Sequence, residues 1–406
     1  MKSWSQFLLN QRMLIILILG FSSGLPLALV GSTLQAWMTS EKVDLSIIGM
    51  FSLVALPYTL KFLWSPLLDR YTLPFLGRRR GWLALTQVGL VVSLILMSFS
   101  DPIKDLSSIA ALACITAFLS ASQDTVIDAY RTEVLTSEEY GYGSALSITG
   151  YRLAMLFSGA FALVLSDQIP WKYVYWVMAG VMSLGFLATL LAREPVTQVQ
   201  APKSLREAVV EPFKEFLSRK GSFEVLTFIT VYKLDVVMTL ALMTPFILGL
   251  GFTRTDIGAV TKGFGLVATI AGTFTGGIWM ARLGIQRSLW IFEILQAISG
   301  LTFYALSLLG HHYPMMVLTI ACENFFSGMG NSAYSAFLMS LCNPRYTATQ
   351  YALLSSLMAL TRTLAGAPSG HLAQNLGWPN YFLLSMALAL PGLILLTRYP
   401  RWNKKA

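Results

Sequence analysis

The chain has 406 residues, of which 55% are hydrophobic and 12% charged, and its mean hydropathy is +0.62. Soluble domains carry about 25% charged residues, so this composition excludes an ordinary water-soluble protein and indicates a chain surrounded by lipid. The net charge of +9 would suggest nucleic acid in a soluble protein, but here it predicts basic loops on one side of a membrane and no nucleic-acid partner.

The amino terminus, MKSWSQFLLNQR, runs into a long apolar stretch without a small-residue cleavage site, which predicts an uncleaved first membrane helix. A spanning helix needs about 20 mostly apolar residues. Twelve segments qualify: 12–38, 45–68, 81–99, 107–129, 143–166, 171–193, 222–250, 254–281, 286–309, 313–341, 347–374 and 377–398. The sequence therefore predicts an all-α membrane protein with twelve transmembrane helices.

The loops of one side hold twenty of the lysines and arginines, and those of the other hold four: Lys42, Lys104, Lys172 and Arg254. Because cytoplasmic loops are enriched in these residues, both termini are expected on the cytoplasmic side. The three cysteines, Cys114, Cys322 and Cys342, have no metal-site spacing, so we interpret them as packing residues and expect no metal.

The long loop 194–221 divides the spans six and six, which predicts an N-terminal half (1–193), a linker, and a C-terminal half (222–406). Two arginine- and glycine-containing segments, 65–81 and 276–288, follow helices 2 and 8 at a spacing of half the chain, which favours two homologous halves. In the linker, Ser204 and Glu207 form a capping box at the start of an amphipathic helix. That helix is expected to lie on the membrane surface or to act as an ordinary linker.

Ten charged residues lie within the predicted spans, where a charge at mid-helix costs about 2.5–3.5 kcal/mol. We therefore expect them to face one another or a wet cavity, on a path for substrate or ions. They are the cations Lys61, Arg152, Lys233, Lys262 and Arg362 and the acids Asp124, Asp128, Asp235, Glu293 and Glu323.

On helix 4, Asp124 and Asp128 are four residues apart and Arg131 follows three later, so all three share one face. We hypothesise that Asp124, the deeper acid, carries a proton; the alternative is a structural ion pair with Lys61 or Arg152. On helix 10, Glu323 can carry a proton, bind a hydroxyl or pair with Arg362, and the sequence does not rank these roles. Glu293 is expected to be structural.

The segment 65–80 resembles the loop motif of the major facilitator superfamily, through Asp69, Arg70, Gly77, Arg78 and Arg79. It departs from that motif in having Ser65 where glycine is usual and in the inserted residues YTLPFL. The resemblance implies a major facilitator fold with a cytoplasmic gate in which a helix-4 acid pairs with the loop arginine. We assign that acid to Asp128, paired with Arg78 or Arg79.

A closer resemblance covers nearly the whole chain. The segments GFSSGLPLALVGSTLQAWM, KFLWSPLLDRY, GRRRGW, SASQD, GYRL, CENFFSGMG and TATQYALLS are similar to those of the AmpG muropeptide permeases of Gram-negative bacteria. This resemblance implies proton-driven import of N-acetylglucosaminyl-1,6-anhydromuramyl peptides across the inner membrane, for cell-wall recycling and β-lactamase induction. It implies no cofactor beyond the proton gradient, and a single chain is expected to suffice.

Such a substrate carries carboxylates and sugars, so its expected contacts are cations, amides and aromatic side chains. The candidates are Lys61, Gln123, Tyr151, Arg152, Lys233, Lys262, Asn324 and Arg362. The alternatives are a transporter of another anionic or sugar substrate such as an acyl-CoA, a membrane enzyme, or a sensor. No G-x-S-x-G or H-E-x-x-H motif supports an enzyme, and no long loop supports a sensor domain.

Overall fold

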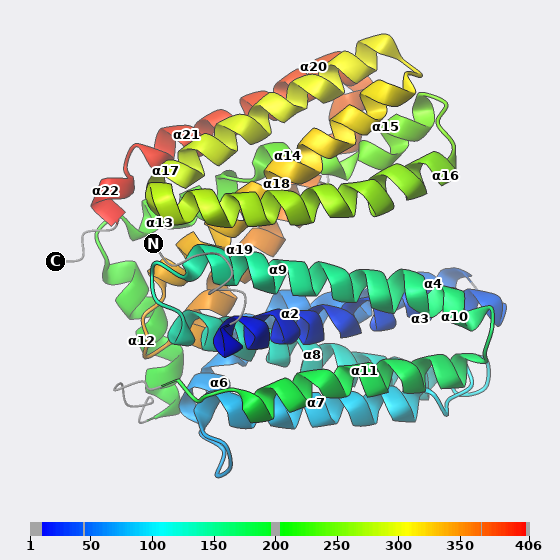
Figure 1. Ribbon diagram of the computed structural model, residues 1–406, viewed down its shortest axis with the longest axis vertical. Coiled ribbons are helices and arrows are strands. Elements are labelled where there is room, and N and C mark those ends of the chain that lie inside the picture. The colour runs from blue at the N-terminus through cyan, green and yellow to red at the C-terminus, as the bar shows by residue number, and fades with distance from the viewer. Residues whose placement is uncertain (1–9, 44, 196–203, 367, 403–406) are drawn as a thin grey trace. The chain divides into compact units, whose positions relative to one another are not determined.

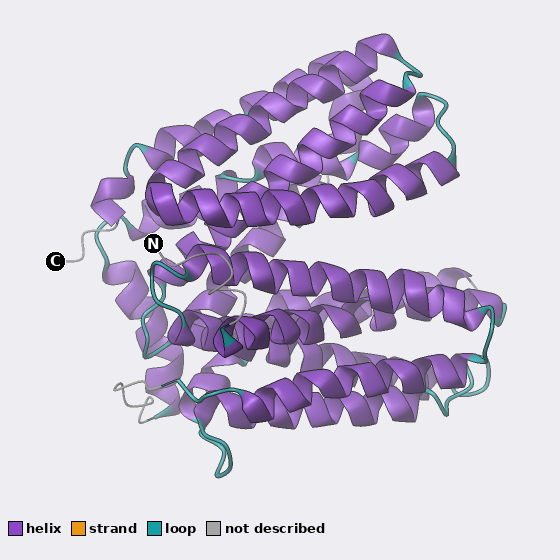
Figure 2. Ribbon diagram, viewed as in Figure 1, coloured by secondary structure: helices purple, strands orange, loops and turns teal. Residues whose placement is uncertain are grey.

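The computed structural model describes residues 10–43, 45–195, 204–366 and 368–402, and every regular element within these ranges is a helix (Figure 2). The all-α prediction is therefore confirmed. By contacts between α-carbons the chain forms two compact units. Unit 1 comprises 1–136, 146–212 and 342–356, and unit 2 comprises 137–145, 213–341 and 357–406.

Unit 1 is built from the helices of the first half of the chain together with the first part of α19. Its elements are α2 (Gln11–Val30), α3 (Ser32–Ser40), α4 (Leu45–Met50), η1 (Phe51–Ala55), α5 (Leu56–Leu60), η2 (Lys61–Leu63), α6 (Ser65–Arg70), α7 (Arg78–Met97), α8 (Leu106–Val134), most of α9 (Tyr140–Leu156), η3 (Phe157–Phe161), α10 (Ala162–Ser166), α11 (Trp171–Leu191), and parts of α12 (Leu205–Ser218) and α19 (Thr347–Gly366).

Unit 2 is built from most of the remaining helices. Its elements are α13 (Ser222–Val231), α14 (Leu234–Ala241), α15 (Met243–Gly249), α16 (Arg254–Ile257), η4 (Gly258–Phe264), α17 (Gly265–Leu309), α18 (Tyr313–Leu341), the rest of α19, α20 (Ser369–Ala387), α21 (Ala389–Leu396) and α22 (Tyr399–Trp402). Figure 1 shows α17 bending sharply, and the bend falls at Gly284, whose φ of 78° is left-handed and suits glycine.

Each of the twelve predicted spans is helical over most of its described residues. By length and composition, eight helices in the described ranges are suited to cross a membrane, and the longest, Ala259–Leu309, contains two predicted spans on either side of Gly284. The predicted span 45–68 is a series of short helical pieces, two of which begin with a proline in their first turn. The predicted break at 375–376 is instead a kink at Gly377 within α20.

The core of unit 1 lies between α2, α7, α8 and α11, which run alongside one another (Figure 1). Leu25, Leu94, Ala117 and Met178, one from each helix, are fully buried there. The linker helix α12 also packs against protein. Ser204 accepts a hydrogen bond from the Glu207 amide at 3.1 Å, so the serine half of the predicted capping box is confirmed. The Glu207 carboxylate pairs with Arg345.

In unit 2, α17 and α18 pack so closely that glycine is required at their crossing. A Cβ on Gly272 would lie 1.9 Å from the carbonyl oxygen of Phe325, and a Cβ on Gly328 would lie 2.4 Å from that of Thr269. Backbone atoms cannot move aside as a flexible side chain can. Small residues at such positions let membrane helices approach one another.

This contact predicts that Gly272→Ala destabilises the protein by more than the roughly 1–3 kcal/mol that overpacking usually costs. The same substitution in α20, Gly370→Ala, meets no heavy atom within 4 Å and serves as the matched control. Thermal melting of both purified variants in detergent checks the prediction. Equal melting temperatures for the two variants would contradict the close crossing.

Candidate functional site

A buried ion-pair network lies where α6 ends, α7 begins and α8 ends, all within unit 1. Arg79 is fully buried and donates to Asp69 at 2.8 Å and to both oxygens of Glu133 at 2.5–3.1 Å. Arg78 donates to Glu133 at 3.1 Å. The guanidinium fork can hold two carboxylates at once, and here it links the motif acid of α6 to an acid of α8. The predicted residues Asp69, Arg78 and Arg79 are thus brought together.

The predicted pairing of Asp128 with Arg78 or Arg79 is wrong. Asp128 pairs instead with Arg131 at 3.0 Å and with Lys61 at 3.8 Å. The α8 acid that faces the two arginines is Glu133, five residues further along. The stripe of acids on α8 predicted a polar face correctly, but spacing on one helix does not show which neighbouring arginine lies opposite each acid. Arg70 lies over the ring of its neighbour Tyr71, at 5.5 Å.

Asp69 also binds the amino terminus of α19. Its two oxygens accept hydrogen bonds from the backbone amides of Ala348 (3.2 Å) and Thr349 (2.8 Å), and from the Thr349 hydroxyl (2.7 Å). A carboxylate is favoured at this position because the first amides of a helix have no intrahelical acceptor and carry partial positive charge. One buried acid therefore joins the motif arginine to a helix that begins 278 residues later in the chain.

Glu194 caps the amino terminus of α7 in the same way. Its carboxylate accepts from the backbone amides of Arg79 (2.8 Å) and Arg80 (3.0 Å). Arg80 in turn donates to the carbonyls of Thr189 and Leu190 at the end of α11. Sequence analysis missed both Glu133 and Glu194. Their only signal was an acidic residue near the predicted cytoplasmic end of a helix, a position that many solvent-exposed acids share.

Deeper in unit 1, Asp124 accepts a hydrogen bond from the Ser23 hydroxyl of α2 at 2.6 Å. Lys61 lies near enough to act electrostatically on Asp124, although its ion pair is with Asp128, one turn away on α8. Two acids and two cations, Asp124, Asp128, Lys61 and Arg131, therefore form one polar group. The structure brings together three residues that the sequence placed on a candidate substrate or ion path, Lys61, Asp124 and Asp128, and adds Arg131 to them.

Two of the predicted substrate ligands are engaged within the protein. The Gln123 amide is buried and exchanges hydrogen bonds with Ser22 of α2 at 3.0 and 3.1 Å. Asn324 accepts from Thr269 and donates to the Ile320 carbonyl. Tyr151 and Arg152 are half-buried on α9. The side chains of Lys262 and Arg362 lie outside the described residues.

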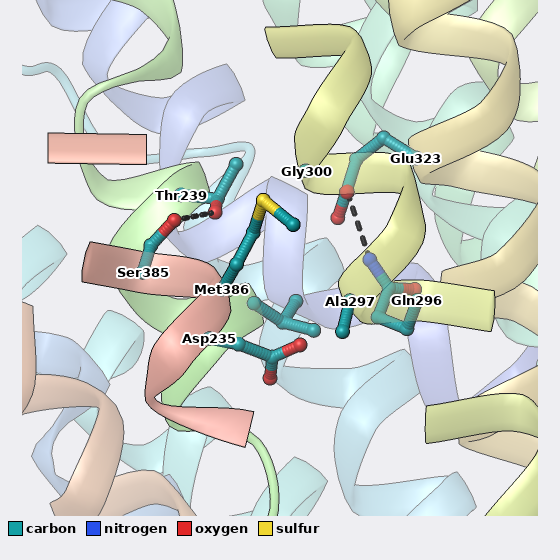
Figure 3. A pocket seen from close by; sticks show the side chains of 9 residues that line it. Asp235, Thr239, Gln296, Ala297, Gly300, Glu323, Ser385 and Met386 are labelled. Atoms are coloured by element: carbon teal, nitrogen blue, oxygen red, sulfur yellow. Dashed lines mark hydrogen bonds between the residues drawn. The ribbon is translucent and has the colours of Figure 1, made fainter. Parts of the chain in front are cut away.

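Unit 2 contains a second buried polar cluster around a cavity with about 180 Å³ of space free of atoms. Figure 3 shows Asp235, Glu323 and Gln296 around this cavity, with Thr239 and Ser385 hydrogen-bonded to each other at its edge. Glu323 accepts from Gln296 at 2.8 Å and from Ser299 at 3.0 Å. Only about 10 Å³ of this space admits a water-sized molecule, so the cavity suits about one water molecule or ion.

Lys233 lies beside that cluster, at the break between α13 and α14. It is 7% exposed, and its ammonium group lies 5.3 Å from the centre of the Tyr232 ring. Within the described part of the chain it has no hydrogen-bond acceptor. The structure therefore places Lys233 and Glu323, both predicted site residues, in one half of the protein, and adds Asp235 to them.

Residues 14–365 and 225–405 match the Major Facilitator Superfamily. The chain is 49% identical over 387 residues to the anhydromuropeptide permease of Escherichia coli K12, covering 95% of this chain and 79% of the relative. It is 35% identical to a putative transporter AmpG 4 of Rickettsia conorii, covering 95% of this chain and 96% of that one.

Two solved structures share the fold at low identity. The proton:xylose symporter XylE matches with a TM-score of 0.70 and 11% identity, over 97% of this chain and 96% of that one. The human organic anion transporter MFSD10 matches with a TM-score of 0.67 and 14% identity, over 97% and 100%. The predicted fold class is confirmed by these matches and by the family match.

The buried network predicts that Glu133→Gln lowers stability by about 3–5 kcal/mol, because it leaves Arg79 buried with one carboxylate fewer. Asp128→Asn on the same helix is the matched control, and its effect is expected to be smaller because that carboxylate is 21% exposed. Melting temperatures of the two purified variants show which substitution causes the larger loss of stability. A larger loss for Asp128→Asn would contradict the pairing of Glu133 with the motif arginines.

Proposed function

We propose that this chain, which belongs to the major facilitator superfamily and within it to the AmpG family, imports N-acetylglucosaminyl-1,6-anhydromuramyl peptides from the periplasm to the cytoplasm. It is a multi-pass membrane transporter and not an enzyme. The observation that carries the substrate is the 49% identity to an anhydromuropeptide permease over 95% of the chain. The proposal places the protein in the bacterial inner membrane with both termini in the cytoplasm, acting as a monomer.

Buried cations support an anionic substrate. The Lys233 ammonium has no hydrogen-bond acceptor within the described residues, and the Lys61 ammonium has only a 3.8 Å contact with Asp128. A lysine held in this way gains from binding a carboxylate, because the desolvation of its charge is already complete. We therefore infer that Lys61 and Lys233 receive the carboxylates of the peptide, together with Arg152, Lys262 and Arg362. Tyr151 is inferred to contact the sugars.

Proton coupling is proposed to act through Asp124 and Glu323. When Asp124 and Asp128 are both ionised, their two negative charges balance the positive charges of Lys61 and Arg131. A proton on Asp124 leaves one positive charge in excess, which attracts a carboxylate of the substrate. Proton and anionic substrate then favour each other's binding, and this reciprocity is the requirement for symport.

The network of Asp69, Arg78, Arg79 and Glu133 is proposed as the cytoplasmic gate. Asp69 holds the amino terminus of α19 through three hydrogen bonds while Arg79 holds Asp69. Opening this gate requires that the α19 amides exchange Asp69 for water. Arg70, at the end of α6, is proposed to support the gate from the loop.

The test is uptake of labelled anhydromuropeptide into proteoliposomes with and without an inward pH gradient. With one coupled proton, each pH unit supports about tenfold accumulation. We expect at least this for wild type, whereas Asp124→Asn should bind the substrate but accumulate about tenfold less of it for each pH unit. Asp101→Asn, in an exposed loop of the same unit, should behave as wild type.

Wild-type uptake that ignores the gradient would contradict coupling. No uptake of the muropeptide under any driving force would contradict the substrate, and labelled acyl-CoA and simple sugars would then be tried in the same vesicles. Accumulation by Asp124→Asn equal to wild type would remove Asp124 from the coupling mechanism.

A further inference from the structure

The polar cluster of unit 2 contains one acid that the proposed function does not use. Glu293 lies on α17, fully buried, and interacts electrostatically with both Asp235 and Lys233. Glu323, on α18, interacts with the same two residues. Glu293 and Glu323 therefore both lie within electrostatic reach of Asp235 and Lys233, and all four residues are less than one-tenth exposed.

Several carboxyl oxygens of this cluster lack a hydrogen-bond donor. Within the described residues, both carboxyl oxygens of Glu293, one of Asp235 and one of Glu323 have no donor. Ionised carboxylates accept hydrogen bonds but cannot donate them, so two ionised acids cannot satisfy each other. A carboxylic acid can donate to a neighbouring carboxylate. A proton within the cluster would therefore supply the missing donor.

The net charge of the cluster also favours a bound proton. With all three acids ionised and Lys233 protonated, the cluster would carry a net charge of −2 away from water. A buried charge that is not paired is costly, and closely spaced carboxylates do not all ionise together. Among the described residues, the other titratable groups that face these acids are Tyr232, beside Glu293, and Cys322, beside Glu323. Tyr334 stacks on Tyr232. On α20, Ser385 and Met386 face the cavity and add no charge.

The backbone beside this site is irregular, and a small polar cavity adjoins it. Lys233 has non-helical angles (φ −112°, ψ 18°) between α13 and α14, and Asp235 lies in the first turn of α14. The ammonium group of Lys233 lies where a Cβ on Gly330 of α18 would be, 2.6 Å away. The cavity beside Asp235 and Glu323 is lined by hydroxyl and amide groups and is too small for a disaccharide peptide (Figure 3).

We propose that Asp235, Glu293 and Glu323 form a second proton-binding site, in which a proton is held among the three carboxyl groups and Lys233 is the internal cation that governs its release. A proton from water in the cavity binds a carboxylate oxygen to form a carboxylic acid, and on release it returns to water and restores the carboxylate. Lys233 keeps its own protons throughout. The coupling of this site to import rests on the function proposed above.

Lys233 links the proton to the substrate. When a carboxylate of the substrate binds the ammonium group, that group no longer offsets the negative charge of the cluster, so the proton is held more firmly. When the substrate leaves, Lys233 again offsets the cluster and the proton departs. This order couples one proton in unit 2 to the anionic substrate by charge alone.

The first test does not depend on transport. Infrared spectra of the purified protein at neutral pH should contain the C=O stretch of a buried carboxylic acid, which ionised carboxylates lack. We expect this band to be lost or shifted in Glu293→Gln and in Asp235→Asn. It should remain in Asp256→Asn, which changes an acid of α16 in the same unit whose carboxylate accepts hydrogen bonds from Thr253. No such band in wild type, or a band unchanged by both cluster variants, overturns the proposal.

The second test measures coupling. In proteoliposomes with a gradient of one pH unit, we expect the ratio of gradient-driven uptake to substrate counterflow to fall by about tenfold in Glu293→Gln, because the proton of unit 2 no longer contributes to accumulation. Gly330→Ala, which displaces the Lys233 ammonium without removing an acid, should shift the pH profile of uptake. Asp235→Asn, which also removes an acid of the cluster, replaces Glu293→Gln if the latter does not fold. Glu293→Asp, which keeps the acid, should retain the wild-type ratio.

The outcomes separate the two proposals. A wild type that transports no muropeptide but shows the infrared band contradicts the substrate and leaves the proton site standing. Normal muropeptide transport with an unchanged ratio in Glu293→Gln overturns the coupling role of the site. Uptake driven by a sodium gradient at constant pH, and abolished by Asp235→Asn, would assign the cavity to sodium and overturn the proton proposal.

Discussion

A guanidinium group that is fully buried must be surrounded by negative charge, and unit 1 is organised around that requirement at Arg79. Its two acids come from α6 and α8, so one ion-pair network holds the ends of three helical segments. Removing one partner of such a network is strongly destabilising, which keeps the arrangement unique. The Asp69 carboxylate can accept further hydrogen bonds, and it accepts them from the amino terminus of α19. The proposed gate is a consequence of this one buried charge.

The two buried clusters differ in charge balance, and that difference separates their proposed roles. In unit 1, Asp69 and Glu133 offset Arg78 and Arg79, so the network is neutral with every group in its usual ionisation state. In unit 2, three acids face a single lysine. A balanced network suits a latch whose protonation stays constant, whereas an unbalanced one gains from holding a proton. Both clusters use residues whose cost in a membrane is high unless they act together.

The shared fold does not decide what is transported. The xylose symporter and the organic anion transporter match this chain at 11% and 14% identity, so they show the architecture only. The chemistry of a muropeptide instead requires buried cations, and Lys61 and Lys233 lie in the two units of this chain. Each is close to an acid proposed to carry a proton. When the cation that binds the substrate lies beside the acid that binds the proton, the two binding events are coupled directly by electrostatic interaction.

The sequence by itself determined which segments are helical, which charges are buried in them, and the family to which the chain belongs, because hydropathy and short motifs are local properties. It also placed Asp69 and Arg79 in one motif, although it did not predict that they pair with each other. Only the tertiary structure decided that Glu133 rather than Asp128 faces the arginines, that Glu194 caps α7 from 115 residues away, and that Glu293 approaches Asp235. Helical spacing defines one face of one helix, whereas these pairings depend on how that helix is rotated against its neighbours. That rotation is set by close packing, as at Gly272 against Phe325, and it cannot be predicted from a single sequence.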